Sequence, residues 1–212
     1  MPVARSEGSV RERLLAAAND LFYEEGVHTV GIDRVLERAG VAKASLYGTF
    51  GSKEELVRAY LEERGLRRRE RITRHIAQHD DPRTRILSIF DLLAEIARET
   101  SFQGCAFVRA CAEGPGGPTT PARQVSSNQR GWMRDLFVQL ASDLGARDPV
   151  QLGQRLSLLY DGAIITAWMD SDPSAPVAAR QVAESLLDAQ IAAKAPAKRA
   201  AKQPRKRATK AT

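Results

Sequence analysis

Apolar residues recur along most of the chain with the spacing of amphipathic helices. From residue 14 to residue 22, leucine, alanine and phenylalanine side chains repeat at intervals that place them on one helical face. Ser9 and Glu12 precede this run with the spacing of a capping box. The pattern predicts a first helix that begins after Ser9 and ends at Gly26.

Two short helices are predicted next, close together in the sequence. Residues 32–39 carry one apolar face, formed by Ile32, Val35, Leu36 and Ala39. Gly40 then allows a left-handed turn, a conformation that glycine adopts at little cost. A further helix is predicted over residues 42–50, so the segment 31–50 is interpreted as two helices joined by a tight turn.

Capping and proline signals mark the remaining helices. Ser52 with Glu55 repeats the capping-box spacing and predicts a longer helix toward His75. At three places a capping side chain precedes proline, which is favourable at the first helical position. These signals predict helices over residues 82–99, 121–144 and 149–170, with a short segment near 104–112, a proline- and glycine-rich loop at 115–118 and a last helix over 176–193. No strand alternation is present, so the predicted fold class is all-α.

Charge divides the chain of 212 residues into unequal parts. The net charge is +6, yet residues 194–212 hold eight Lys or Arg and no acid, which leaves 24 bases and 26 acids elsewhere. Such a segment buries too little apolar surface to fold by itself. We therefore predict a disordered basic tail over residues 194–212.

Several classes of protein are disfavoured. No stretch approaches the ~20 apolar residues of a membrane span, and the N-terminal residues lack a signal-peptide pattern, so we expect a cytoplasmic protein without a membrane partner. Cys105 and Cys111 are too few for a disulfide scaffold. His75 and His79 lack a third metal ligand, and neither a catalytic triad nor a glycine-rich phosphate loop is present. We expect no enzyme activity, no cofactor and no metal.

The segment 31–50 has the arrangement of a helix-turn-helix, whose second helix lies in the DNA major groove. Together with Gly26, the Leu46–Tyr47 pair, Phe50 and residues 52–56, it resembles the DNA-binding domain of TetR-type transcriptional regulators. The resemblance implies an N-terminal three-helix DNA-binding domain over residues 1–55 and a larger helical domain over 56–193. It also implies an all-helical homodimer that binds double-stranded DNA at a palindromic operator and responds to a small-molecule effector bound in the C-terminal domain.

The resemblance also implies which side chains face DNA. The expected set is Thr29, Lys43, Ser45, Tyr47, Gly48, Thr49 and Lys53. Tyr47 and Lys53 are expected to touch phosphates, since Lys53 lies in the first turn of a helix, where phosphates bind readily. Residues 1–55 hold seven bases and nine acids, so charge alone attracts DNA weakly. We expect the tail to add non-specific phosphate contacts, unless it only confers solubility, through Lys198, Arg199, Lys202, Arg205, Lys206 and Arg207.

The C-terminal half contains a helix that is apolar nearly all round, over residues 156–169. Such a helix must be covered on more than one side, and the last helix offers a second apolar stripe of Val182, Leu186, Ala189 and Ala193. The two C-terminal helices therefore suit a dimer interface. Asp161, the one charge in 156–169, is expected to pair with an arginine or tyrosine of the chain, or with a cationic ligand.

An effector pocket is expected between the helices of this half. Its candidate lining, for which plain core packing is the alternative, is Phe90, Leu93, Phe102, Phe107, Trp132, Met133, Phe137 and Tyr160. These residues suggest a mostly apolar effector. The sequence is thus interpreted as a ligand-responsive repressor. Two other interpretations stay open: a DNA-coating protein that acts through its tail, and a regulator that senses thiol oxidation or metal.

Overall fold

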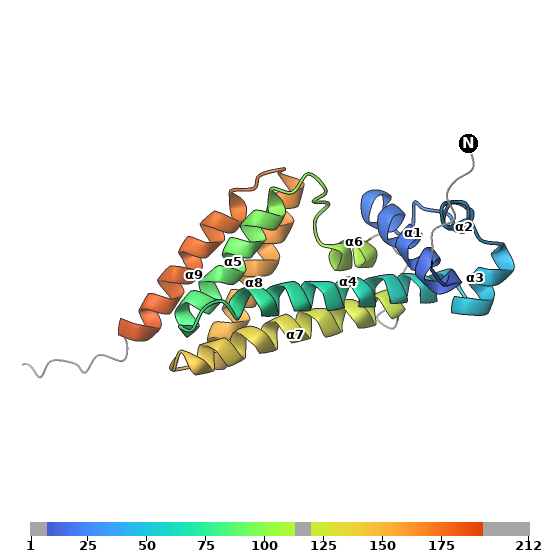
Figure 1. Cartoon of the computed structure of the whole chain (residues 1–212). Helices are drawn as coiled ribbons and strands as arrows, with labels where there is room; N and C mark the ends of the chain where they lie inside the picture. The colour runs from blue at the N-terminus through green and yellow to red at the C-terminus, as the bar shows by residue number, and fades with distance from the viewer. Residues whose placement is uncertain (1–7, 113–119, 193–212) are drawn as a thin grey trace, which may run out of the picture.

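The computed structural model describes residues 8–112 and 120–192 of the chain. These residues form an elongated molecule of helices without strands (Figure 1). In chain order the helices are α1 (Val10–Glu25), α2 (Ile32–Ala39), α3 (Lys43–Phe50), α4 (Lys53–Ile76), α5 (Pro82–Ala97), α6 (Ala106–Ala112), α7 (Pro121–Asp143), α8 (Pro149–Met169) and α9 (Ala175–Ala192). The predicted all-α fold is confirmed, and each predicted helix ends within about two residues of its predicted position. The loop predicted at 115–118 lies outside the described residues.

Helix caps follow the sequence signals, with one difference. At α1 the Ser9 hydroxyl accepts from the Glu12 amide at 3.2 Å, and the Glu12 carboxylate accepts from the Ser9 amide at 2.8 Å. At α4 the Ser52 hydroxyl accepts from the Glu55 amide at 3.2 Å, but the Glu55 carboxylate pairs with Arg58 at 3.1 Å. The full capping box predicted there is therefore wrong, because a cation one turn along the helix takes the carboxylate.

The first hydrophobic core joins α1, α2 and α3 to the first half of α4. Phe22 and Tyr60 meet edge to face at its centre, with 5.6 Å between their ring centres. Helix α6 also belongs to this core, through Ala106, Phe107 and Ala110. The core thus contains a segment that lies far along the chain from the three N-terminal helices.

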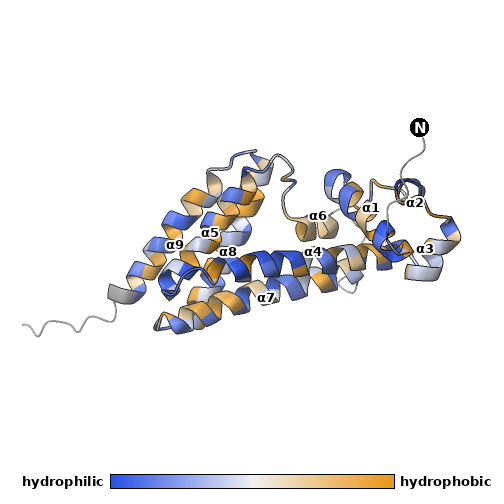
Figure 2. Cartoon of the chain, viewed as in Figure 1, coloured by the Kyte–Doolittle hydropathy of each residue, from blue (hydrophilic) through white to orange (hydrophobic). Residues whose placement is uncertain are grey.

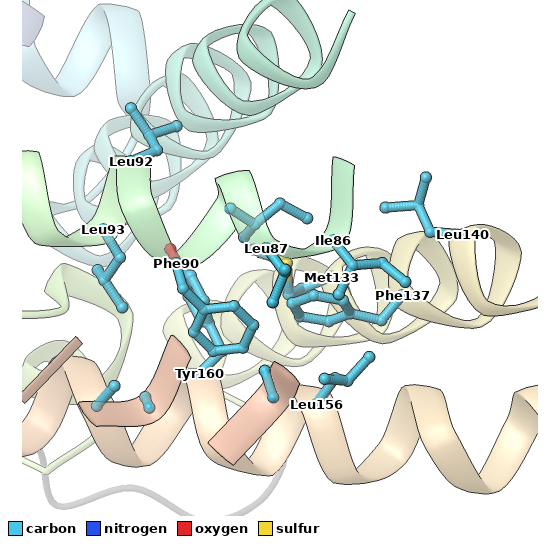
Figure 3. Packing of buried hydrophobic residues seen from close by; sticks show 14 of the residues in the cluster. Ile86, Leu87, Phe90, Leu92, Leu93, Met133, Phe137, Leu140, Leu156 and Tyr160 are labelled. Carbon is cyan, nitrogen blue, oxygen red and sulfur yellow. The ribbon is translucent and has the colours of Figure 1, made fainter. Parts of the chain in front are cut away.

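The second core joins α5, α7, α8 and α9 to the second half of α4. The rings of Phe90, Phe137 and Tyr160 lie together in it, with centres 5.9 to 6.3 Å apart (Figure 3). Apolar residues gather in α5, α8 and α9, while the middle of α4 is mostly hydrophilic (Figure 2). Helix α4 runs unbroken through both cores and so connects them.

No helix within the described ranges 8–112 and 120–192 has both the length and the apolar character needed to cross a membrane.

Candidate functional site

Helices α2 and α3 form a compact pair at one tip of the molecule (Figure 1). Gly40 ends α2 in the left-handed conformation, with φ 63° and ψ 42°, which turns the chain sharply into α3. Val35 and Leu46 are fully buried between these helices and the core. This packing fixes which face of α3 is buried and leaves the opposite face at the tip of the molecule open to solvent.

The predicted DNA-facing residues of α3 occupy that open face. Lys43, Tyr47, Gly48 and Thr49 are exposed, while Ser45 is half-buried. The Thr49 hydroxyl donates to the Ser45 carbonyl at 2.7 Å. The Lys43 ammonium lies 3.5 Å from the Asp33 carboxylate, and both side chains are largely exposed. Thr29, in the turn before α2, is exposed as well.

Lys53 is held differently from the residues of α3. Its ammonium lies 6.0 Å from the centre of the Phe22 ring, and burial lowers the pKa of Lys53. The side chain borders a cavity of about 210 Å³ between α4 and the start of α7. To reach a phosphate, the Lys53 ammonium must move away from the Phe22 ring.

Arg11 is a cation near α3 that was not predicted from the sequence. It is exposed, and its guanidinium carbon lies 5.8 Å from the centre of the Phe50 ring at the end of α3. Its position depends on how α1 packs against α3, which local sequence spacing does not reveal. The candidate tail contacts, from Lys198 to Arg207, lie outside the described residues.

The outer face of α8 and α9 is apolar and uncovered in the single chain. Leu158, Met169 and Val182 are 67%, 70% and 50% exposed. On α8 the exposed or half-buried positions Leu158, Gly162, Ile165 and Met169 recur at helical spacing. On α9, Leu186 is half-buried and Ala189 exposed, whereas Ala179, Ala183 and Leu187 face the core. Ala193, the last member of the predicted stripe, lies outside the described residues.

Two cavities border Arg68 among helices α4 to α8, which with α9 make up the larger half of the molecule. The smaller, about 270 Å³, lies between α4, α5, α8 and the segment before α6, and the predicted residues Leu93, Phe102, Phe107 and Tyr160 line it. The larger, about 620 Å³, lies between α4, α6, α7 and α8, and Phe107 and Met133 line it. Asp161, at the edge of the larger cavity, accepts from Arg130 at 2.8 Å, which is the pairing within the chain that the sequence suggested.

Three predicted pocket residues lie elsewhere. Phe90 and Phe137 are fully buried in the second core and line neither of these two cavities (Figure 3). Trp132 lies 5.3 Å from the guanidinium carbon of Arg69 and also lines neither. Core and cavity walls use the same apolar residue types, so helical periodicity does not separate them. Four arginines of the smaller cavity were not predicted from the sequence: Arg64, Arg67, Arg68 and Arg71.

Tyr23 joins α1 to the wall of the smaller cavity. Its hydroxyl accepts from the Gln103 amide at 3.0 Å and donates to the Gly104 carbonyl at 3.3 Å. Its carbonyl accepts from Arg109 of α6 at 2.6 Å. The guanidinium carbon of Arg64 lies 3.6 Å from the centre of its ring. Tyr23 therefore connects α1 to the segment that lines the smaller cavity.

The candidates for thiol and metal chemistry are placed as follows. Cys105 and Cys111 are free, half-buried and border the larger cavity. The rings of His75 and His79 meet edge to face, with centres 6.0 Å apart. Residues 8–112 and 120–192 contain no group of three or more His, Cys, Asp or Glu positioned to hold a metal ion.

Known proteins share this architecture. A family model described as bacterial regulatory proteins of the tetR family matches residues 14–60. The structure of a TetR-family transcriptional regulator from Streptomyces coelicolor is 30% identical, with a TM-score of 0.80 over 85% of this chain and 95% of that one. A TetR-type regulator from Streptomyces avermitilis is 33% identical, with a TM-score of 0.79 over 87% of this chain and 99% of that one. The chain belongs to the TetR family.

As a member of the TetR family, the chain is a DNA-binding transcriptional regulator, and α2 and α3 are its helix-turn-helix. A further relative is the transcriptional repressor NemR of Escherichia coli, 31% identical over 110 residues, which are 51% of this chain and 55% of NemR.

Proposed function

We propose that two copies of the chain form a homodimer through α8 and α9, bind a palindromic operator with α3, and release it when a small molecule binds in the larger half. One observation carries the proposal. Helix α3, with its open face, and the pair α8 and α9, with their uncovered apolar face, lie at opposite ends of the molecule (Figure 1). A dimer joined at the far end presents two reading helices, as a two-fold symmetric operator requires.

Within this dimer the DNA contacts divide by chemistry. Tyr47, half exposed on α3, and Arg11 beside its end suit phosphates, which fix the position of the protein without reading sequence. Lys43 and Ser45 suit base edges, because the exposed Lys43–Asp33 pair contributes only ~0–1 kcal/mol and opens readily. Thr29, Thr49 and Lys53 add polar contacts, and Gly48 lets the DNA backbone approach closely.

Repression is the mode we propose, by analogy with the relative NemR. An operator that overlaps a promoter excludes the polymerase while the dimer is bound. This requires the protein to share a compartment with chromosomal DNA, which in bacteria is the cytoplasm.

DNA reading is tested by selecting genomic fragments with the full chain and with a chain that ends at residue 193. Both are expected to enrich one palindrome. Tyr47→Ala removes one phosphate hydrogen bond from each half-site, and each such bond contributes about 1.5–3 kcal/mol. The variant is therefore expected to weaken operator binding by ~100-fold or more. Broad, salt-sensitive binding without any enriched sequence would instead favour the DNA-coating alternative.

The dimer is tested by placing a charge on its proposed interface. Leu158→Arg is expected to give the mass of one chain in size-exclusion chromatography with light scattering, and to lose operator binding. Leu66→Arg is the matched control, because Leu66 is also an exposed leucine, at 59%, but lies on α4. A Leu158→Arg protein that stays dimeric would contradict the interface.

A further inference from the structure

The larger cavity is lined by more positive than negative charge. Four arginines and one carboxylate border it, and the carboxylate, Asp161, is taken by Arg130. Arg123, Arg130 and Arg134 are exposed, whereas Phe107, Met133 and Gln129 are buried. The cavity thus has a basic mouth and a mostly apolar floor, and a basic mouth raises the local concentration of anions.

Gln129 contributes a buried side-chain amide to the lining of this cavity. The side chain is only 2% exposed, and its Oε1 accepts from the Nε of Arg69 at 2.8 Å. That bond fixes the orientation of the amide, because the Arg69 donor requires an oxygen opposite it. The Nε2 group is buried and has no hydrogen-bond partner among the described residues. A buried N–H without an acceptor is unfavourable, so the site is suited to a molecule that brings an acceptor.

Arg68 presents a second donor to the same space. Its guanidinium carbon lies 5.1 Å from the centre of the Tyr160 ring and 5.9 Å from that of Phe107. Among the described residues no carboxylate lies within 4.0 Å of it, in contrast to its neighbour Arg67, which pairs with Glu63. Burial lowers the pKa of Arg68, but Tyr160, Cys105 and Asp161 together raise it above its ordinary value. The guanidinium is thus a fixed cation that interacts with the Tyr160 hydroxyl and is attracted by Asp161 without direct contact.

We propose that the effector of this regulator is an organic carboxylate, with its two oxygens on Arg68 and the Gln129 amide and its apolar part against Phe107 and Met133. A carboxylate supplies the acceptor that the Gln129 amide lacks and a direct anionic partner for Arg68, and guanidinium groups bind carboxylates in this planar manner. The apolar floor favours a carbon skeleton over a bare inorganic anion. This inference rests on the proposed ligand response and replaces the mostly apolar effector expected from sequence with one that carries a negative charge.

The proposal is tested by calorimetric titration of the full chain without DNA. The ligands are octanoate and phenylacetate, their neutral counterparts octanamide and phenylacetamide, and inorganic phosphate. At least one carboxylate is expected to bind about ten-fold or more tightly than its amide, since the charge-assisted bonds are lost in the amide. Phosphate is expected to bind more weakly than that carboxylate. Equal affinity for acid and amide, or no binding by either carboxylate, would overturn the proposal.

Variants locate the carboxylate on the proposed donors. Arg68→Gln and Gln129→Glu are each expected to lose the preference for acid over amide, the second because it adds a like charge. Arg67→Gln is the matched control, one residue away on α4 and outside the larger cavity, and is expected to keep the preference. Circular dichroism establishes that each variant is folded. Retention of the preference by both Arg68→Gln and Gln129→Glu would overturn the site.

The experiments can refute the carboxylate site without refuting the proposed function, and the reverse. If a neutral compound releases the operator and carboxylates do not bind, the proposed regulator stands and the carboxylate inference is wrong. If carboxylates bind through Arg68 but no DNA sequence is selected, the inference about the cavity stands and the proposed operator-binding function is wrong.

Discussion

Replacing Gly153 by alanine tests how closely α7 and α8 must approach. A Cβ atom built at Gly153 would lie 2.5 Å from the Cγ2 of Val138, 2.8 Å from its amide nitrogen and 2.9 Å from its Cα. Ordinary carbon–carbon contacts are ~3.5–4.0 Å. Two of the three atoms belong to the backbone of α7, so a side-chain rotation cannot relieve the clash. The two helices must move apart.

The change in the free energy of unfolding caused by Gly153→Ala follows from two opposing effects. Overpacking a core costs typically about 1–3 kcal/mol, and the backbone clash places this substitution near the upper value. Alanine gains ~0.5–1 kcal/mol over glycine inside a helix. The net loss is therefore ~2 kcal/mol, which lowers the melting temperature by ~4–8 °C for a chain of this size.

Gly131→Ala, on α7, is the matched control. A Cβ atom there meets only the flexible side chain of Arg134, at 3.9 Å. No clash then opposes the higher helix preference of alanine over glycine, and the melting temperature is expected to rise by ~1–4 °C. Both variants are measured by calorimetry at one protomer concentration, because dimer formation would make the melting temperature depend on it. A Gly153→Ala protein that melts at or above the unmodified chain would refute the close contact between α7 and α8.

Three further predictions concern coupling, salt and pH. Tyr23→Phe keeps the ring on Arg64 but loses the hydroxyl bonds to Gln103 and Gly104; operator affinity is expected to persist while its change on adding effector shrinks, as measured by fluorescence anisotropy. Ending the chain at residue 193 is expected to flatten the dependence of log K on log salt by ~0.9 for each phosphate that the tail neutralises, and an unchanged slope would mean that the tail does not touch DNA. Asp81→Ala removes the cap of α5, in which hydrogen bonds from Thr84 lower the pKa of Asp81. Because that pKa is depressed in the folded chain, its contribution is present near neutral pH, and the stability difference between the proteins is expected to shrink as the pH falls below ~4.

Local sequence signals were sufficient to predict where the helices begin and end. Ser9, Gly40 and the proline signals each specify a helix end through the few residues around it, and all of the predicted ends agree with the structure to within about two residues. The buried side of α3 was predictable for the same reason, since Leu46 is the apolar residue that must face α2 and the core. Those features depend on spacing within one helix or one turn.

Features that depend on distant packing were not predictable. Lys53 lies beside Phe22 and Arg11 beside Phe50 because of how α1 sits against α3 and α4. The pocket shows the same limit. Phe90 and Phe102 have the same chemistry in the sequence, but one is enclosed by the core and the other borders a cavity. Phe90 lies on α5 and Phe102 in the segment between α5 and α6, and only the tertiary packing separates these two outcomes.

The arginines of α4 show why this limit matters for function. A run of charges on a helix normally indicates a solvated face, and Arg67 follows that rule with its partner Glu63. Arg68, one position along, lies instead between two aromatic rings on the wall shared by two cavities. Burial of a cation is unfavourable, and at Arg68 the interactions with Tyr160, Cys105 and Asp161 offset that penalty. Positions where a charge lies in such surroundings concentrate at functional sites, which supports the proposal that Arg68 binds the effector.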